Sequence, residues 1–218
     1  MSDTTHKSAD KDHRKPELSL RQVPVQARAQ QSRSKILEVA IELLEEVGMD
    51  DFNTNLLAER AEVKVRTVYR YFPNKFAIVA TIGEEMFKRW SDWNEVHFQS
   101  LSDPASDWEK TLRTMIDGWI ARLTEEKGAR ALLQAIRSVP QLRELDVIAY
   151  SAWVGEFERA FRLRQPDVAP QITTVCHVTV SSVYGLIDYY FRCPPAIRSG
   201  LSAELAEQIV GRLRALLR

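Results

Sequence analysis

Apolar residues recur every three or four positions along almost the whole chain, and no stretch shows the strict alternation of a half-buried strand. The first apolar stripe begins after residue 31 and ends at Gly48, a residue type that commonly terminates helices. Its members are Ile36, Ala40, Leu43 and Val47. Proline, glycine and aspartate divide the rest of the chain into helix-sized segments. The further helices expected span residues 53–61, 65–72, 75–100, 107–127, 129–139, 142–165, 168–191 and 202–217. The pattern therefore predicts an all-α fold of about nine helices.

The charges are balanced over the chain but segregated along it. The 218 residues are 44% hydrophobic, enough for a folded core, and 30 Lys and Arg balance 30 Asp and Glu. Residues 14–35 hold six Lys or Arg and one acid, residues 38–59 hold seven acids and no Lys or Arg, and residues 60–75 hold five Lys or Arg and one acid. Any binding to an anionic polymer must therefore use the two local basic segments.

The compartment follows from what the chain lacks. Cys176 and Cys193 are too few for a disulfide framework, and no apolar run approaches the length of a membrane span. The polar N-terminus has no apolar centre of the kind found in secretory signals. We therefore expect a cytoplasmic protein with reduced thiols, no contact with membranes and no cofactor or metal.

Residues 53–72 have the spacing of two short helices joined by a tight turn. The inward positions step by three or four residues and are Leu57, Ala61, Val65, Val68 and Phe72. Ala58 is a small residue at the point where the two helices would cross closely. This arrangement predicts a helix-turn-helix.

The second of these two helices presents a mixed polar surface suited to DNA. The side chains expected to face outward are Lys64, Arg66, Thr67, Tyr69, Arg70 and Tyr71. Arginine can pair with guanine edges, threonine and tyrosine can reach phosphates or a thymine methyl, and lysine neutralises backbone charge.

Helix termini in this region add further candidate contacts. Asn53 or Thr54 is expected to cap the first short helix, whose N-terminal amides then face a phosphate. Asn74 can cap the helix that begins at Lys75. A cation in a first turn opposes the helix dipole by about 0.3–1 kcal/mol. Lys75 therefore indicates either an anionic partner or a solvated lysine that tolerates this cost.

Residues 26–82 contain, in order, a basic lead-in, "ILEVAIELLEEVG", "NTNLLAERAEV" and "TVYRYFPNK". With these motifs the segment resembles the DNA-binding domain of the TetR family of bacterial transcriptional regulators. The resemblance implies that the helix containing residues 66–71 enters the major groove of double-stranded DNA. It also implies DNA contacts at the positions of Thr54, Thr67, Tyr69, Tyr71 and Lys75. The implied domains are a flexible basic arm (1–30), a helix-turn-helix domain (31–78) and a helical effector-binding and dimerisation domain (79–218).

The chain departs from the family pattern at two positions and carries a basic arm. Glu62 stands where the family usually has glycine in the turn, and Lys64 where it often has serine. Because a non-glycine residue at positive φ is strained by about 1–2 kcal/mol, a wider turn is expected. Arg28 and Arg33 are expected to precede the first helix and to reach the minor groove or backbone, as homeodomain arms do. A merely solubilising tail is the alternative.

The last two long helices are the candidate dimer interface. One helix-turn-helix makes too little contact for specific regulation, so such proteins bind palindromic operators as symmetric dimers. In the family the final two helices pair with their twofold mates as a four-helix bundle. The candidate interface residues are Val175, Thr179, Val183, Tyr184, Ile187, Ile209 and Leu213. Ordinary packing within one chain is the alternative.

The middle of the chain is the candidate site for an unknown small-molecule effector. It is rich in aromatic residues, and those proposed to line a pocket are Trp90, Trp93, Trp119, Trp153 and Phe157. Aromatics form pocket walls, but they also fill cores. The resemblance implies a repressor that the effector releases from its operator.

Other classes of function find weaker support. The chain shows no glycine-rich phosphate loop, no metal-spaced His/Cys cluster and no G-x-S-x-G motif, so we do not expect an enzyme. Two alternatives stay open: a thiol sensor that uses Cys176 or Cys193, and a helical interaction protein in which Glu62 has abolished specific DNA binding.

Overall fold

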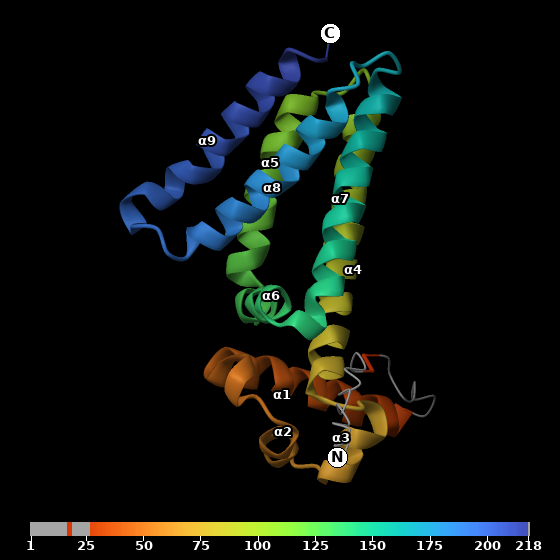
Figure 1. Cartoon of the computed structure of the whole chain (residues 1–218), viewed down its shortest axis with the longest axis vertical. Helices are drawn as coiled ribbons and strands as arrows, with labels where there is room; N and C mark the ends of the chain where they lie inside the picture. Colours follow the sequence, from red (N-terminus) through yellow and green to blue (C-terminus); the bar gives the residue numbers. More distant parts are fainter. Residues whose placement is uncertain (1–16, 19–26, 218) are drawn as a thin grey trace, which may run out of the picture.

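The computed structural model describes residues 17–18 and 27–217, and in that part of the chain every regular element is helical. A small unit contains α1 (Ala27–Asp51), α2 (Thr54–Arg60) and α3 (Val65–Tyr71). A larger body contains α4 (Lys75–Ser102), α5 (Trp108–Glu125), α6 (Ala129–Ser138), the 3₁₀ turn η1 (Pro140–Leu142), α7 (Arg143–Arg164), α8 (Ile172–Tyr190) and α9 (Pro195–Arg214). The small unit lies at one end of the elongated molecule (Figure 1). The all-α prediction is confirmed.

Three helix starts differ from the sequence-based expectation by more than one residue. α1 begins at Ala27, not after residue 31, because residues 27–31 are strong helix formers. α8 begins four residues later than expected, at Ile172. α9 begins at Pro195 and not at residue 202, because proline is well suited to the first turn and Gly200 continues the helix. Gly48 does interrupt α1, with φ 68°, as the pattern predicted.

The small unit has its own apolar core and polar fastenings. Phe52, Leu57, Val68 and Phe72 are fully buried in it. The guanidinium of Arg60 on α2 donates to both carboxylate oxygens of Glu46 on α1, at 2.7 and 2.8 Å. Two parallel N–H···O bonds set orientation as well as distance, so this pair holds α2 at a defined angle to α1.

Helix α4 connects the two parts of the molecule. It starts beside the small unit, runs along α7 in the larger body and contacts α1, α5 and α6 on the way. The expected domain boundary at residues 78 and 79 therefore falls inside one continuous helix. No described helix combines the length and hydropathy needed to cross a bilayer.

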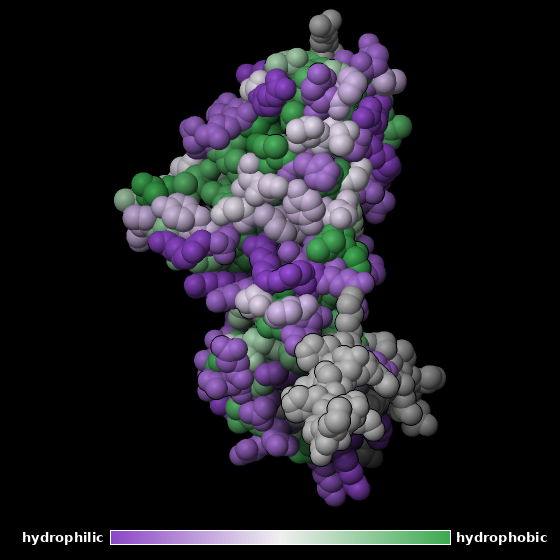
Figure 2. Space-filling model, in the orientation of Figure 1, coloured by the Kyte–Doolittle hydropathy of each residue, from purple (hydrophilic) through white to green (hydrophobic). Residues whose placement is uncertain are grey.

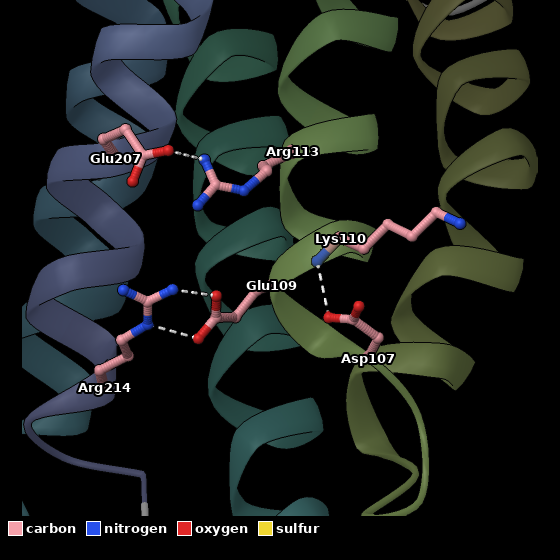
Figure 3. A network of polar contacts seen from close by, with 6 residues as sticks. All are labelled: Asp107, Glu109, Lys110, Arg113, Glu207 and Arg214. Atoms are coloured by element: carbon pink, nitrogen blue, oxygen red, sulfur yellow. Dashed lines mark hydrogen bonds and ion pairs between the residues drawn. The ribbon is translucent and has the colours of Figure 1, made fainter.

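Ion pairs fasten α9 to α5 (Figure 3). Arg214 on α9 donates to both carboxylate oxygens of Glu109 on α5, and Arg113 on α5 pairs with Glu207 on α9 at 2.5 Å. Asp107 caps α5 by accepting from the backbone N–H of Lys110 at 3.0 Å. These contacts join the C-terminal helix to the core of the larger body.

We expect the free energy of unfolding to fall in acid below about pH 4.5. Hydrogen bonds from Arg60, Lys35 and Arg214 lower the pKa values of their respective partners Glu46, Glu62 and Glu109 from the ordinary value of 4.5. A carboxylate with a lowered folded-state pKa stabilises the protein above the unfolded value, and this contribution is lost as the pH falls through the folded value. Urea unfolding between pH 7 and pH 3 measures the effect.

The control for the acid effect is the double variant Arg60→Gln, Arg214→Gln. It should be less stable at pH 7 and should lose less stability than the wild type on acidification, because two of the paired carboxylates no longer have lowered pKa values. Identical pH profiles for the two proteins would contradict this explanation.

Candidate nucleic-acid interface

The turn between α2 and α3 is compact. The N–H of Val63 donates to the carbonyl of Ala58 at 2.9 Å, and the N–H of Glu62 donates to that of Glu59 at 3.0 Å. These two bonds form a Schellman motif, in which Glu62 takes the left-handed position with φ 55°. The expectation of a wider turn is therefore wrong: the glutamate adopts the conformation for which glycine is better suited. Its carboxylate turns to Lys35 on α1, at 2.6 Å.

Replacing Glu62 tests this strain directly. A non-glycine residue in the left-handed region is strained by about 1–2 kcal/mol. We expect Glu62→Gly to raise the Tm by about 2–4 °C relative to Glu62→Ala, because both variants lose the Lys35 pair and only glycine relieves the backbone. Thermal unfolding followed by circular dichroism measures the difference. An alanine variant as stable as the glycine variant would show that the turn is unstrained.

Helix α3 presents a polar, basic outer face. Lys64, at its N-cap, and Arg66 and Arg70, along its length, are exposed. Within the described residues, the side chains of Lys64 and Arg66 have no hydrogen-bond or ion-pair partner. Tyr69 is 42% exposed, and Thr67 beside it is half-buried. The exposure of Lys64, Arg66, Tyr69 and Arg70 agrees with the predicted outer face, and Thr67 is partly exposed beside them. Their contacts with DNA stay a prediction.

The start of α2 lies next to this face. Asn53 caps α2 by accepting from the N–H of Leu56 at 2.9 Å. The hydroxyls of Thr54 and Tyr69 are 3.0 Å apart and share a hydrogen bond. The two short helices thus bring polar side chains to one surface, as a helix-turn-helix that reads DNA requires.

Tyr71 is not on this face. Its side chain is 2% exposed and forms part of the core of the small unit. Its hydroxyl donates to the carbonyl of Ala29 at 3.3 Å and accepts from Arg70 at 2.5 Å. The prediction that Tyr71 faces outward is therefore wrong. The spacing contained the signal, because Tyr71 lies three residues after the buried Val68 and so on the same side of the helix.

Lys75 has a structural partner that the sequence did not reveal. Its ammonium donates to the carbonyls of Met49 and Phe52, at 3.0 and 3.1 Å, where α1 ends. Asn74 caps α4, as predicted, by accepting from the N–H of Ala77 at 2.9 Å. The cation that opposes the dipole of α4 thus satisfies carbonyls at the end of another helix, and an anionic partner is not needed to explain it.

We expect Lys75→Met to destabilise the protein by about 1.5–3 kcal/mol. Methionine retains much of the apolar stem but leaves the two partly buried carbonyls without their charged donor. Equilibrium urea unfolding of the variant gives the value. Lys64→Met, a change of the same kind at an exposed site without a described partner, is the control and should be close to neutral.

The basic residues of the expected arm differ from the expectation. Both Arg28 and Arg33 belong to α1 and do not precede it. Arg33 is directed to α4, where its guanidinium pairs with Glu85 at 2.8 Å. The side chain of Arg28, and residues 1–16 and 19–26 of the arm, lie outside the described part of the chain.

The aromatic residues proposed as a pocket are mainly core. Trp119 is stacked on Trp153, with ring centroids 5.1 Å apart and planes at 16°, and Phe157 packs edge-on against Trp119. Trp90, Trp119, Trp153 and Phe157 are all less than 9% exposed. Trp93 is half-buried, with the guanidinium of Arg122 over its ring at 4.2 Å. The core interpretation that the sequence left open fits these residues better than a pocket wall.

Most of the candidate dimer residues also pack within the chain. Those that are buried are Val175, Thr179, Val183, Ile187, Ile209 and Leu213. Tyr184 is half-buried beneath the guanidinium of Arg137, at 4.4 Å. Interior packing therefore explains these apolar stripes without a second chain.

A groove nevertheless runs between α8 and α9 on the surface. Its volume is about 430 Å³, and Val175, Thr179 and Ile209 reach its edge. Val178 is not among the predicted interface residues; it lines the groove and is 58% exposed. Figure 2 shows hydrophobic side chains gathered along this groove. Val178 thus leaves an apolar side chain of α8 uncovered at this groove.

The cysteines have the properties of inert core residues. Burial raises the pKa of Cys176 to about 12, and Cys193 is buried with its thiol directed at the carbonyl of Tyr190. A protonated thiol is a poor nucleophile, so thiol sensing gains no support. Among the described residues, no group of three His, Cys, Asp or Glu side chains is arranged to hold a metal.

A short basic helix-turn-helix unit joined to a larger helical body defines the architecture of a single-motif transcriptional regulator. Residues 36–82 match the bacterial regulatory proteins of the tetR family, and residues 107–217 match the tetracyclin repressor-like C-terminal domain. The chain belongs to the TetR family. Proteins of this family are DNA-binding transcription factors and not enzymes.

Individual relatives are similar over part of their length. The tetracycline repressor protein class G of Vibrio anguillarum is 33% identical over 99 residues, which cover 45% of this chain and 44% of that protein. The class A repressor from transposon 1721 of Escherichia coli is 34% identical over 149 residues, which cover 68% and 63%. The chain thus spans about half to two thirds of the length of these relatives.

A solved structure extends the similarity to the whole fold. SmeT, the repressor of the Stenotrophomonas maltophilia multidrug efflux pump SmeDEF, superposes with a TM-score of 0.65 at 18% identity. The superposition covers 84% of this chain and 91% of that protein. SmeT has also been solved as a complex with triclosan. At this identity the likeness shows a shared fold.

Proposed function

We propose that this protein is a transcriptional repressor that binds a palindromic operator as a homodimer and is released from it by a small-molecule effector. The observation that carries the proposal is the outer face of α3, where Lys64 and Arg66 are exposed without partners in the described chain. Cations left unpaired on a rigidly fastened helix are available to DNA phosphates and base edges.

The proposed contacts divide by chemistry. Arg66 reads base edges in the major groove, and Lys64 and Arg70 neutralise phosphates. Thr54, Thr67 and Tyr69 add hydroxyl contacts, and the amides at the start of α2, behind the Asn53 cap, face a phosphate. Arg33, Tyr71 and Lys75 position the helices without touching DNA, because Tyr71 is buried and the charged groups of Arg33 and Lys75 are bound to acceptors on other segments.

The proposed dimer forms at the groove between α8 and α9. The exposed Val178 and the half-buried Leu205 line this groove and would be covered by the same two helices of a second copy. Two copies related by a twofold axis place two α3 helices on one face of the DNA, as recognition of a palindrome requires.

The proposed effector response needs a mechanical link between the larger body and the small unit. α4 is one such link, and the turn before α6 is another. The N–H of Gly128 donates to Glu45 on α1 at 2.8 Å, and Lys127 pairs with Glu42 on α1 at 2.7 Å. A side chain at Gly128 would collide with Ile41 of α1. A ligand that moves α6 would therefore move α1, and would shift the equilibrium if it binds the two arrangements unequally.

Selection of bound fragments from random duplex DNA tests the proposal. The expected result is a palindromic site, bound by a dimer, with an affinity that falls steeply with salt. Sedimentation of the complex gives the stoichiometry. Salt-sensitive binding without an enriched sequence would overturn the repressor proposal and favour the helical interaction protein.

A further inference from the structure

A hollow between α4 and α7 has an unusual combination of groups. Its volume is about 410 Å³, and it lies beside the stacked tryptophans and not among them. The apolar part of its wall includes Phe98 from α4 and Trp153 from α7. Trp153 thus has one face on Trp119 and also borders the hollow.

A buried amide with an unsatisfied donor lines this hollow. Asn94 is 1% exposed, and its Oδ1 accepts from the indole N–H of Trp119 at 2.9 Å. Its Nδ2 is buried and finds no partner within the described chain. A buried unpaired N–H costs about 1–3 kcal/mol. The Trp119 bond fixes the orientation of the amide. Asn94 borders the hollow, so an acceptor atom of a ligand that enters it is the partner this buried donor lacks within the described chain.

The rim of the hollow is negatively charged. Three carboxylates line it, from Asp92, Glu95 and Glu156, against the single guanidinium of Arg159. Asp92 is paired with Lys88 at 2.9 Å and Glu156 with Arg159, both on their own helices. Glu95 receives only a 3.5 Å contact from Gln99 among the described residues. The rim therefore favours a cation near Glu95 and Glu156.

We propose that this hollow binds an organic cation that carries an aromatic or other apolar body and one hydrogen-bond acceptor. The acceptor meets Nδ2 of Asn94, the apolar body lies against Phe98 and Trp153, and the positive charge lies between Glu95 and Glu156. This proposal gives the chemical class of the effector. Only the expected effect of the ligand on operator binding rests on the proposed function.

Three benzamides that differ in charge test the site by calorimetry on the full chain without DNA. The cation is procainamide, with a protonated tertiary amine; the neutral analogue is 4-amino-N-butylbenzamide; the anion is 4-aminohippurate. All three carry the same aromatic ring and amide carbonyl. We expect procainamide to bind about tenfold more tightly than the neutral analogue and the anion to bind more weakly than both. Equal affinities, or no binding of procainamide at millimolar concentration, would overturn the proposal.

Substitutions separate the two parts of the recognition. Glu95→Gln with Glu156→Gln should reduce procainamide affinity about tenfold and leave the neutral analogue unchanged. Arg159→Gln should raise procainamide affinity by about threefold, because it frees Glu156. Asn94→Leu should weaken both ligands by the same factor, since both use the carbonyl. If Asn94→Leu does not fold, the double glutamine variant and Arg159→Gln still test the proposal. A procainamide affinity unchanged in both of these variants would overturn it.

The test distinguishes this site from the repressor proposal. If the protein binds an operator but not procainamide, the cation-site proposal is overturned and the repressor proposal stands. If the protein binds procainamide with the expected variant effects but selects no DNA sequence, the cation site is established and the repressor proposal is overturned. Release of operator by procainamide in the wild type, and not in the double glutamine variant, is the expected result when both hold.

Discussion

Substitution of Arg66 by alanine should weaken operator binding by about 30-fold or more while leaving the protein folded. The side chain of Arg66 is exposed on α3 and forms no hydrogen bond or ion pair within the described chain, so its truncation does not disturb the small unit. One arginine contact to a base edge contributes about 1–3 kcal/mol, and a dimer on a palindrome loses two of them. At 1.4 kcal/mol per tenfold change in affinity, the lower bound of about 2 kcal/mol already exceeds tenfold.

Fluorescence anisotropy with the selected operator, at two salt concentrations, measures this change. Lys64→Ala should weaken all sequences alike and reduce the salt dependence by about one phosphate per half-site, whereas Arg66→Ala should also relax the sequence preference. Arg143→Ala, at an exposed arginine on α7, is the matched control and should bind like the wild type. If Arg66→Ala leaves the operator affinity and the DNA sequence preference unchanged, α3 is not the recognition helix.

Substitution of Trp119 by alanine should reduce the free energy of unfolding by about 3–5 kcal/mol. The indole is 1% exposed, stacked on Trp153, in edge contact with Phe157 and bonded to Asn94. Truncation therefore opens a cavity and also leaves the Oδ1 of Asn94 without its donor. Urea unfolding followed by far-ultraviolet circular dichroism gives the value.

A graded control is Trp119→Phe, which retains an aromatic ring in the stack and loses the indole N–H. It should cost less than alanine but more than a change at the half-buried Trp93. The measurement separates a core from a pocket wall. If Trp119→Ala preserved the unfolding midpoint and abolished ligand binding instead, the tryptophan would belong to a ligand site.

The helix-turn-helix illustrates how far local patterns reach. Asn74 is the predicted cap of α4 and Asn53 one of two candidates, with Thr54, for the cap of α2. Asn53 and Asn74 each accept the expected backbone N–H three residues on. Capping depends on φ and ψ over a single turn, so residue type and position suffice. The exposed face of α3 also follows from spacing, except at Tyr71, which lies three residues after the buried Val68 and therefore on the inner side of the helix.

Lys75 illustrates what local patterns miss. Its position in a first turn was recognised as unusual, but its partners are the carbonyls of Met49 and Phe52, more than twenty residues away in sequence. Arg33 likewise forms its ion pair with a residue on another helix, Glu85 of α4. A hydrogen bond between distant segments depends on how helices pack, and residue spacing within one helix does not predict that packing.

The larger body shows the same division. Periodicity in the amino-acid sequence was enough to establish an all-helical chain, the place of the helix-turn-helix and the apolar stripes of α8 and α9, because backbone geometry converts spacing into a face. It did not establish what covers each face. Trp119 and Trp153 stack on one another, Val178 stays exposed, and Asn94 of α4 lines the same hollow as Glu156 of α7 only because the helices meet at particular angles. Burial and site chemistry arise from contacts between helices, which exist only once the chain has packed.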